Sequence, residues 1–285
     1  MRRSHHARRK RDPVNGRPVP FAKDVTCEDR PQSKSGGRAV VLHYHIFKNA
    51  GTSVDKILKR NFGDRWSTQE FKGPRRHNKE AIAGFLKHNP NVDALSSHTA
   101  RLPPPDVEGL TIIPIVFVRH PIDRLRSAYE FERKQNANTL GARLAKQHDL
   151  KGYLEALLNG EANRQARNFQ TYRLAQNEPG RRPELERATE ALQHLPFVGL
   201  VEAFEHSLTL LVSVMRAYFP DFRYTNEHEN ASQSRDGTLS ERLKLVEESL
   251  GAVFYKRICD CNMEDMAIYE LLSLQFRGVG RSEQA

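Results

Sequence analysis

The chain has 285 residues, of which 38 % are hydrophobic and 28 % are charged, and its formal net charge at pH 7 is +10. This length suffices for one α/β domain with a large buried core. No run approaches the roughly 18 consecutive apolar residues of a membrane-spanning helix, and no apolar core of a signal peptide follows the basic N-terminus. We therefore expect a cytoplasmic protein without a membrane span.

The ends of the chain differ in composition from the rest. Residues 1–36 are rich in arginine and show no apolar periodicity, which is typical of a disordered basic tail. We expect one folded domain over residues 37–277 and a short C-terminal tail over residues 278–285. The three cysteines, at positions 27, 259 and 261, are too few and too poorly spaced for a zinc site.

The first predicted strand, residues 39–46, leads into a turn and then a helix with apolar residues at helical spacing. Gly51 permits a tight turn, and the N-terminus of the new helix can attract an anion together with the charge of Lys48. The candidate phosphate-binding residues are Lys48, Asn49, Ala50, Gly51, Thr52 and Ser53. Because the lysine precedes the glycine, this is not the usual P-loop, and an ordinary strand-to-helix connection with a solvated lysine is the alternative.

A second strand-to-helix unit follows at residues 111–129. Arg119 stands where the strand ends, Pro121 suits the first turn of a helix, and Ser127 lies on that helix. Ligands of open α/β sheets collect at the carboxyl ends of the strands, where an arginine can bind a phosphate with two hydrogen bonds. Two such sites on neighbouring strands indicate a ligand with two separate anionic groups.

The remaining pattern completes an α/β fold. A short strand over residues 92–97 ends at His98, and another strand is predicted at 197–201. Further helices are predicted at residues 80–87, 150–158, 204–215, 239–250 and 263–274. Strands that alternate with helices predict a P-loop-like parallel sheet flanked by helices on both faces. The polar residues Asn163, Arg164, Gln165 and Arg167 either line a ligand site or form a solvated loop, and the polar segment 223–238 can also reach a bound ligand.

Two segments resemble those of sulfotransferases that use 3′-phosphoadenosine 5′-phosphosulfate (PAPS). HIFKNAGTS is similar to H-I-P-K-T-x-G-T-S, and VFVRHPIDRLRSAY is similar to F-x-R-D-P-x-x-R-x-x-S-x-Y. The similarity is greatest to the carbohydrate branch, which includes heparan sulfate 2-O-sulfotransferases and bacterial relatives. Three features depart from the family pattern: Phe47 replaces a proline, His120 replaces an aspartate, and Ala166 replaces a hydroxyl residue in a weaker match at 163–167.

The resemblance implies a function for each matched residue. Lys48 to Ser53 would bind the 5′-phosphosulfate, and Arg119 and Ser127 would bind the 3′-phosphate. Lys48 would also stabilise the transferred group, and His98, which aligns with the histidine base of the glycan enzymes, would deprotonate the acceptor hydroxyl. No metal is implied. The acceptor would be a glycan or another hydroxyl-bearing small molecule, and nothing in the sequence identifies it or the oligomeric state.

Other interpretations remain open for some of these residues. His98 can instead be a surface histidine that takes no part in catalysis. His45 is the second candidate for the base. Strand alternation places His45 on the same strand face as His43, and a buried, hydrogen-bonded histidine is more typical of that position. His120 is expected to orient Arg119 less well than an aspartate would, or to make the site sensitive to pH. A kinase-like phosphotransferase is the alternative enzyme class. It would need a lysine after the glycine and a magnesium-binding aspartate after a strand, and neither is evident in this sequence. The positive charge alone indicates only non-specific attraction to nucleic acid.

Overall fold

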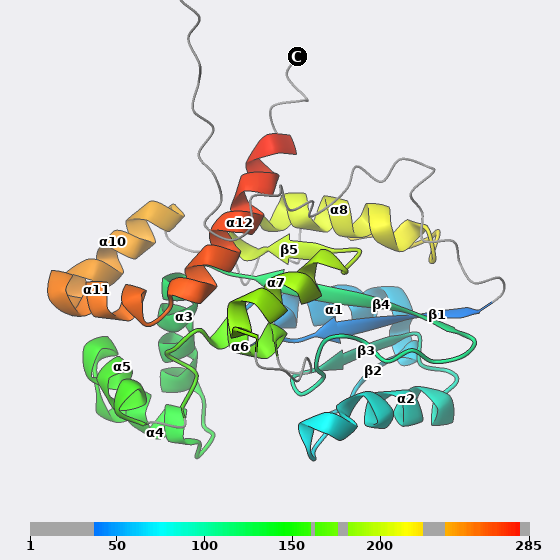
Figure 1. Ribbon diagram of the computed structural model, residues 1–285, viewed down its shortest axis with the longest axis horizontal. Helices are drawn as coiled ribbons and strands as arrows, with labels where there is room; N and C mark the ends of the chain where they lie inside the picture. Colours follow the sequence, from blue (N-terminus) through cyan, green and yellow to red (C-terminus); the bar gives the residue numbers. More distant parts are fainter. Residues whose placement is uncertain (1–36, 161–162, 176–181, 225–236, 280–285) are drawn as a thin grey trace, which may run out of the picture.

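A computed structural model describes residues 37–160, 163–175, 182–224 and 237–279 of the chain. Five parallel strands form one sheet in the order β2-β3-β1-β4-β5, with helices on both faces (Figure 1). This confirms the predicted α/β class and the parallel sheet. The predicted tail over residues 1–36, most of the C-terminal tail and most of the polar segment 223–238 lie outside the described residues.

The strands follow the apolar runs of the sequence. Their bounds are Arg38–Tyr44 (β1), Trp66–Thr68 (β2), Ala94–Ser97 (β3), Leu110–Val118 (β4) and Val198–Leu200 (β5). The central strand β1 pairs with β3 on one side and with β4 on the other, so that Val41 lies opposite both Ala94 and Ile113. The edge strand β2 was not predicted, because three residues are too short a run to show a strand period.

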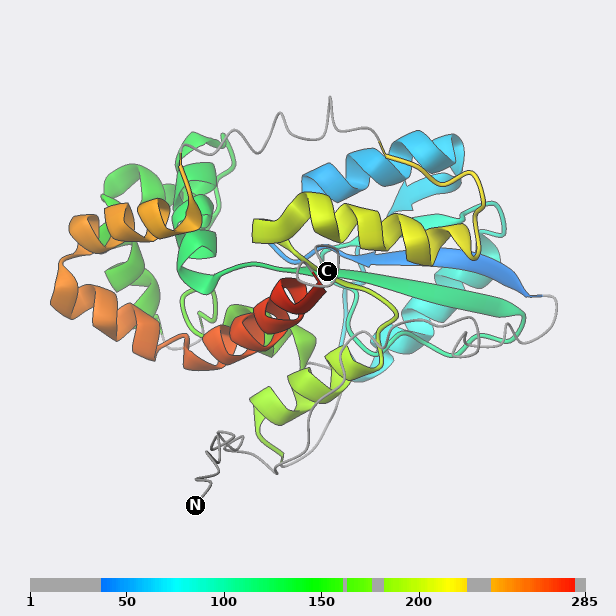
Figure 2. The ribbon, with the colours of Figure 1, turned by 90° about the horizontal axis from the view of Figure 1, so that it is seen from above.

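Side-chain alternation along β1 divides the core into two layers. Val41 points to one face and packs in the core with α1 (Gly51–Phe62) and α8 (Phe204–Arg216). Val40 and Leu42 point to the opposite face. That face is covered by α2 (Asn78–His88), α6 (Phe169–Leu174), α7 (Glu184–Gln193) and α12 (Met263–Val279). Figure 2 shows the two layers above and below the sheet.

A group of helices lies beyond the carboxyl ends of the strands (Figures 1 and 2). It consists of α3 (Pro121–Lys134), α4 (Leu140–Gln147), α5 (Leu150–Asn159), α10 (Leu239–Leu250) and α11 (Ala252–Asp260), which share a third apolar core. Sequence-local contacts fix where these helices begin: Asp149 caps α5, and Thr238 forms a capping box with Glu241 at the start of α10. α4, α6, α7 and α11 were not predicted. No helix in the described part of the chain is both long and apolar enough to cross a bilayer.

Single 3₁₀ turns join several of these elements. They cover Gly63–Arg65 (η1), Arg75–His77 (η2) and Val201–Ala203 (η3). η2 precedes α2, and its first residue, Arg75, reaches Tyr172 of α6. The end of the sheet at which β1, β3 and β4 terminate is therefore bordered by the α3 group on one side and by α6 and η2 on the other.

Candidate active site

The loop between β1 and α1 has an unusual backbone. Lys48 and Ala50 have positive φ angles of 65° and 59°, in the left-handed region. A residue other than glycine is less stable there by about 1–2 kcal/mol. Such a conformation persists only when surrounding contacts determine it, and it is found most often at functional sites.

Two buried side chains hold this loop from below. The Asn49 amide donates to the Phe117 carbonyl and to the Gln170 side chain, both at 2.7 Å, and Asn49 is only 1 % exposed. Arg119 donates to the Lys48 carbonyl at 3.0 Å. Asn49 was predicted to bind phosphate. Its side chain points into the protein, so only its backbone faces the place where a phosphate would bind.

Gly51 is the first residue of α1, and a β-carbon there would lie 2.0 Å from the His45 ring. Only glycine therefore fits at this position. The first N–H groups of a helix have no acceptor within the helix, and the helix dipole favours negative charge beside them. Thr52 is exposed and Ser53 is buried at this end of α1. The loop and the helix end together fit a phosphate or sulfate group.

Lys48 extends from the loop toward α3. Its ammonium lies 4.5 Å from the centre of the Phe131 ring, and the Phe47 ring meets the same ring edge-on at 5.6 Å. Phe131 lies one helical turn after Ser127, so the two side chains occupy one face of α3. Ser127 is half-buried. The structure thus directs Lys48 toward the helix face that carries Ser127.

Arg119 is oriented by Asp123 and not by the residue that follows it. Its Nε donates to Asp123 at 2.9 Å and its Nη2 lies 2.8 Å from the same carboxylate. Arg242 donates to the other oxygen of Asp123 at 2.9 Å. The prediction that His120 orients Arg119 is therefore wrong: the carboxylate comes from the first turn of α3, one helical turn further on.

His120 contacts η3 through its backbone and α12 through its ring. Its backbone N–H donates to Glu202 at 3.0 Å, and its ring meets Tyr269 edge-on. Burial lowers the pKa of His120 to about 4, although Asp123 opposes the shift. His120 is therefore a neutral, buried side chain near pH 7.

His98 is paired with a carboxylate that the sequence did not suggest. Its Nδ1 donates to Glu70 Oε1 at 2.8 Å, and its backbone N–H donates to the same oxygen at 3.1 Å. Thr99 donates to the other Glu70 oxygen at 2.7 Å. Partial burial opposes ionisation of Glu70, but the hydrogen bonds from Thr99 and His98 hold its pKa below the ordinary value. With its proton on Nδ1, the exposed imidazole keeps Nε2 free to accept a proton.

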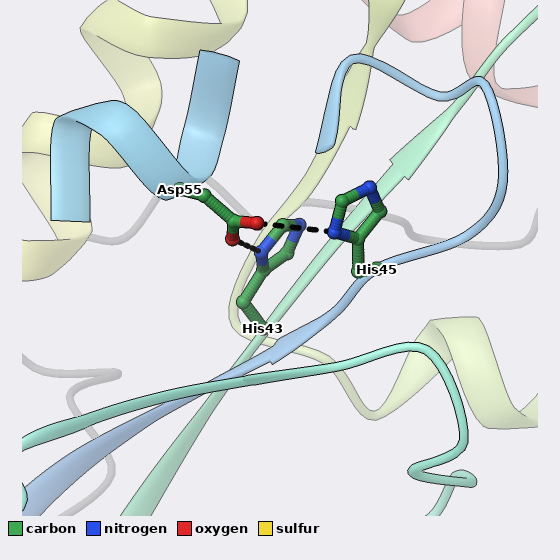
Figure 3. Close-up of side chains that lie close together, drawn as sticks. All are labelled: His43, His45 and Asp55. Carbon is green, nitrogen blue, oxygen red and sulfur yellow. Dashed lines mark hydrogen bonds and ion pairs between the residues drawn. The ribbon is translucent and has the colours of Figure 1, made fainter. Parts of the chain in front are cut away.

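Two further histidine rings, those of His45 and His43, stack in a row beside His98 of this pair. The His45 ring lies 4.0 Å from that of His98 and 5.3 Å from that of His43. His43 and His45 both point to Asp55 in the second turn of α1 (Figure 3). His43 is buried and hydrogen-bonded, as predicted for a histidine on this strand.

An open pocket of about 310 Å³ lies next to His98. It is lined by His45, Phe47, His98, Arg101, Phe169, Tyr172 and Arg173. Burial and the neighbouring Arg101 lower the pKa of Arg173 to about 10, and burial and Arg75 lower that of Arg101. Both guanidinium groups remain charged near pH 7, so the pocket wall is strongly positive.

The polar residues 163–167 do not contribute to the lining of this pocket. Arg164 pairs with Glu184, Arg167 donates to the carbonyl of Leu158, and the Gln165 carbonyl accepts a hydrogen bond from Arg124. These contacts fix a connection between helices. The segment is therefore a hydrogen-bonded connection and not a solvated loop, and Arg164 stacks on Tyr172 of the pocket wall at 4.9 Å.

The asparagine, glutamine and hydroxyl residues of the family pattern, which were predicted at 163–167, occur a few residues later in the chain. Gln170 joins Asn49 to the main chain of Arg119, and Thr171 donates to Asp265 at 2.7 Å. Both side chains are fully buried. Asn168, Gln170 and Thr171 have the Asn-x-Gln-Thr spacing, so the predicted match that included Ala166 was placed too early in the chain.

A parallel sheet with a strained turn after its central strand, and a histidine–carboxylate pair beside an open pocket, fit a group-transfer enzyme of the α/β class. Residues 35–270 match the sequence profile of the sulfotransferase family, and the chain belongs to that family. It is therefore a transferase of sulfuryl groups. The chain is also 43 % identical over 244 residues to an uncharacterized protein of Archaeoglobus fulgidus, in an alignment that covers 82 % of this chain and 95 % of the relative.

Proposed function

We propose that the protein transfers a sulfuryl group from PAPS to a hydroxyl group of a carbohydrate acceptor, in the manner of the carbohydrate sulfotransferases. The main support is one juxtaposition: His98, oriented by Glu70, lines the same pocket as Phe47 of the Lys48 loop and the arginines Arg101 and Arg173. A proton acceptor, an anion-binding loop and a positive acceptor surface are thus adjacent.

The donor would supply an activated sulfuryl group on a 5′-phosphate. The strained loop and the start of α1, from Lys48 to Ser53, would bind the phosphosulfate through backbone N–H groups and the Lys48 ammonium. Arg119 and Ser127 would contact the 3′-phosphate. Arg119 is 3 % exposed and already bound to Asp123, so this contact requires the phosphate to approach a preformed, rigid guanidinium.

His98 would act as the base. Its Nε2 would take the proton of the acceptor hydroxyl while Nδ1 continues to donate to Glu70, which stabilises the imidazolium that forms. The acceptor oxygen would form a bond to sulfur as the bond from sulfur to the phosphate oxygen breaks, leaving adenosine 3′,5′-bisphosphate. Lys48 would stabilise the negative charge on the departing phosphate.

Arg101 and Arg173 favour an acidic acceptor. Their guanidinium groups line one pocket, and Arg101 lowers the pKa of Arg173, so a carboxylate or sulfate between them would relieve the repulsion. Phe169 and Tyr172 supply flat apolar surface in the same pocket, on which a sugar ring can pack.

Calorimetric titration without magnesium tests the donor assignment. We expect adenosine 3′,5′-bisphosphate to bind at least about 10-fold more tightly than AMP or ATP, which corresponds to about 1.4 kcal/mol. Tighter binding of ATP with magnesium would contradict the proposal and favour a kinase. An acceptor screen with ³⁵S-labelled PAPS would then compare acidic with neutral oligosaccharides.

The His98→Ala variant separates chemistry from binding. It should bind adenosine 3′,5′-bisphosphate like the wild type and lose about 100-fold or more in turnover. His88→Gln is the matched control, because His88 is exposed on α2 and hydrogen-bonds only within its own helix at Gly84. Equal activity of the His98→Ala variant and the wild type would exclude His98 as the base.

A further inference from the structure

The side chains of His43, His45 and Asp55 converge between the central strand and the first helix. His43 and His45 are two residues apart on β1 and just after it, so both point to the α1 face. The His43 Nδ1 lies 2.8 Å from Asp55 Oδ1, and the His45 Nδ1 lies 3.1 Å from Asp55 Oδ2 (Figure 3). One potential ligand atom from each of the three residues lies within 4.8 Å of the others.

The three side chains are mostly buried but keep some exposure to solvent. The side chains of His43, His45 and Asp55 are 1 %, 12 % and 19 % exposed. Burial opposes the charge on Asp55, but the hydrogen bonds from His43 and His45 outweigh it and hold the pKa of Asp55 below its ordinary value. Burial lowers the pKa of His43 despite Asp55. The cluster therefore brings two imidazole rings and one carboxylate together in a partly enclosed place, and these are groups that commonly bind metal ions.

We propose that His43, His45 and Asp55 form a binding site for a divalent transition-metal ion such as Zn²⁺. Two imidazole nitrogens and one carboxylate oxygen are a common set of three protein ligands, with further positions left for water or another ligand. Bonds of about 2.0–2.2 Å to Zn²⁺ place tetrahedral ligand atoms about 3.3 Å apart. The His43 Nδ1 lies 2.8 Å from Oδ1 of Asp55 and the His45 Nδ1 lies 3.1 Å from Oδ2, so each nitrogen is already close to one carboxylate oxygen, and all three ligand atoms lie within 4.8 Å of one another.

Binding requires a change of tautomer at the two histidines. Without metal, each Nδ1 donates its proton to Asp55. To bind the ion through Nδ1, each imidazole carries its proton on Nε2 instead. Ser96 lies beside the cluster, with its Oγ 3.3 Å from His43 Nδ1, and itself accepts a hydrogen bond from Trp66. It can hydrogen-bond a water molecule on the ion.

The position of the cluster distinguishes it from the sulfuryl-transfer groups. Its ligands come from the α1 side of β1, whereas Lys48 extends toward Phe131 on α3. His45 nevertheless lines the acceptor pocket and stacks on His98 at 4.0 Å. An ion bound to His45 would therefore fix the ring against which the proposed base packs. This inference does not depend on the identity of the donor or the acceptor.

Metal titration of the full-length protein, purified with chelator, tests the site. We expect one equivalent of Zn²⁺ to bind in competition with a chromophoric chelator, and Co²⁺ to give visible absorption bands of a tetrahedral or five-coordinate site. His45→Gln and Asp55→Asn should each weaken Zn²⁺ binding by at least about 10-fold, because even outer-shell changes cost 10- to 100-fold. His45→Gln leaves the hydrogen bond between His43 and Asp55 in place, and it serves if Asp55→Asn fails to fold.

Two controls exclude other sources of the signal. His5 and His6 in the N-terminal segment could bind metal themselves, so a double His5→Gln/His6→Gln variant should retain the stoichiometric site. The exposed His88→Gln variant should bind like the wild type. The proposal is overturned if no stoichiometric Zn²⁺ binds, if His45→Gln leaves the affinity unchanged, or if the His5/His6 variant abolishes binding.

Discussion

Arg119 at the end of β4 donates a hydrogen bond to the main-chain carbonyl of Lys48 in the loop after β1, at 3.0 Å. The same guanidinium is held by Asp123, and its own backbone N–H donates to Gln170 at 2.9 Å. The two segments that resemble donor-binding motifs are therefore joined directly. Arg119 can contribute to donor binding in two ways, by contacting the 3′-phosphate or by holding the loop.

Arg119→Ala separates these two contributions. If Arg119 contacts the 3′-phosphate, the variant should lose at least about 10-fold in affinity for adenosine 3′,5′-bisphosphate, or about 1.4 kcal/mol, and much less for AMP. If it only holds the loop, both affinities should fall together. Calorimetry with the two nucleotides measures the difference. Arg119→Lys keeps the charge but cannot reproduce the paired contacts, so we expect it to lose most of the discrimination.

Lys48→Ala should reduce turnover by about 100-fold or more, because an ammonium that stabilises the departing phosphate acts mainly in the transition state. Folding should change little, since the contact between Lys48 and Phe131 at 4.5 Å contributes only about 0.5–1 kcal/mol. Turnover and thermal denaturation should be measured on the same preparations. Lys56→Ala, on the exposed side of α1, is the control. Parallel loss of stability and activity would instead indicate that Lys48 is structural.

Glu70→Gln should lower kcat by about 10- to 100-fold while leaving KM nearly unchanged, because it weakens the orientation of His98 and the stabilisation of its protonated form. The glutamine side chain retains the size of Glu70 and can still accept from Thr99. Steady-state kinetics with varied acceptor separates kcat from KM. Glu80→Gln on the exposed face of α2 is the control, and an unchanged kcat would show that Glu70 does not assist His98.

Asn49→Ala should lower the free energy of unfolding by about 2 kcal/mol, because it removes two buried hydrogen bonds, one to the Phe117 carbonyl and one to the Gln170 side chain. It should also weaken nucleotide binding, since the left-handed backbone of the loop loses its anchor. Urea denaturation measures the first effect. Asn61→Ala removes hydrogen bonds to Arg223 at an exposed site and should cost less. A smaller loss for Asn49→Ala than for Asn61→Ala would contradict the proposed anchor.

The features that depend on a local residue pattern could be predicted from the sequence. The strands near residues 39–46, 111–118 and 197–201 are continuous apolar runs, and the helix that ends before Gly160 has a regular apolar stripe. The two motif segments were predicted to meet at one edge of a sheet. Their hydrogen bond between Arg119 and Lys48 agrees with that, because parallel strands end at the same edge.

The remaining features of the site depend on contacts between residues that are distant in the sequence, and these could not be predicted. Glu70 reaches His98 from a segment without regular structure, and Asp265 on α12 accepts from Thr171 on α6. In both cases the two partners lie far apart in the chain, so the local sequence pattern does not pair them. Asp123 was overlooked because His120 occupies the position next to Arg119 in the sequence, whereas in a helix the partner comes from one turn further on. The phosphate and base functions of the predicted residues stay predictions until ligands are tested.

His120 should make folding less favourable in acid. Burial lowers the pKa of His120 to about 4 in the folded protein, whereas the unfolded chain has the ordinary value of about 6.5. Above pH 6.5 the side chain is neutral in both states, and its full contribution to stability is present. As the pH falls from about 6.5 to 4, only the unfolded chain takes up the proton, so stability is lost by up to about 3 kcal/mol.

Urea denaturation between pH 7.5 and 4.5 tests this dependence on wild type and His120→Gln. The difference between the two proteins matters, because other groups titrate in the same range: burial raises the pKa of Glu202, which accepts from the His120 backbone and acts in the opposite sense. We expect the wild type to lose stability faster than His120→Gln by about 1.4 kcal/mol per pH unit below pH 6. His88→Gln, at an exposed site, should follow the wild type. Parallel curves for wild type and His120→Gln would show that His120 gains its proton equally in the folded and unfolded chains.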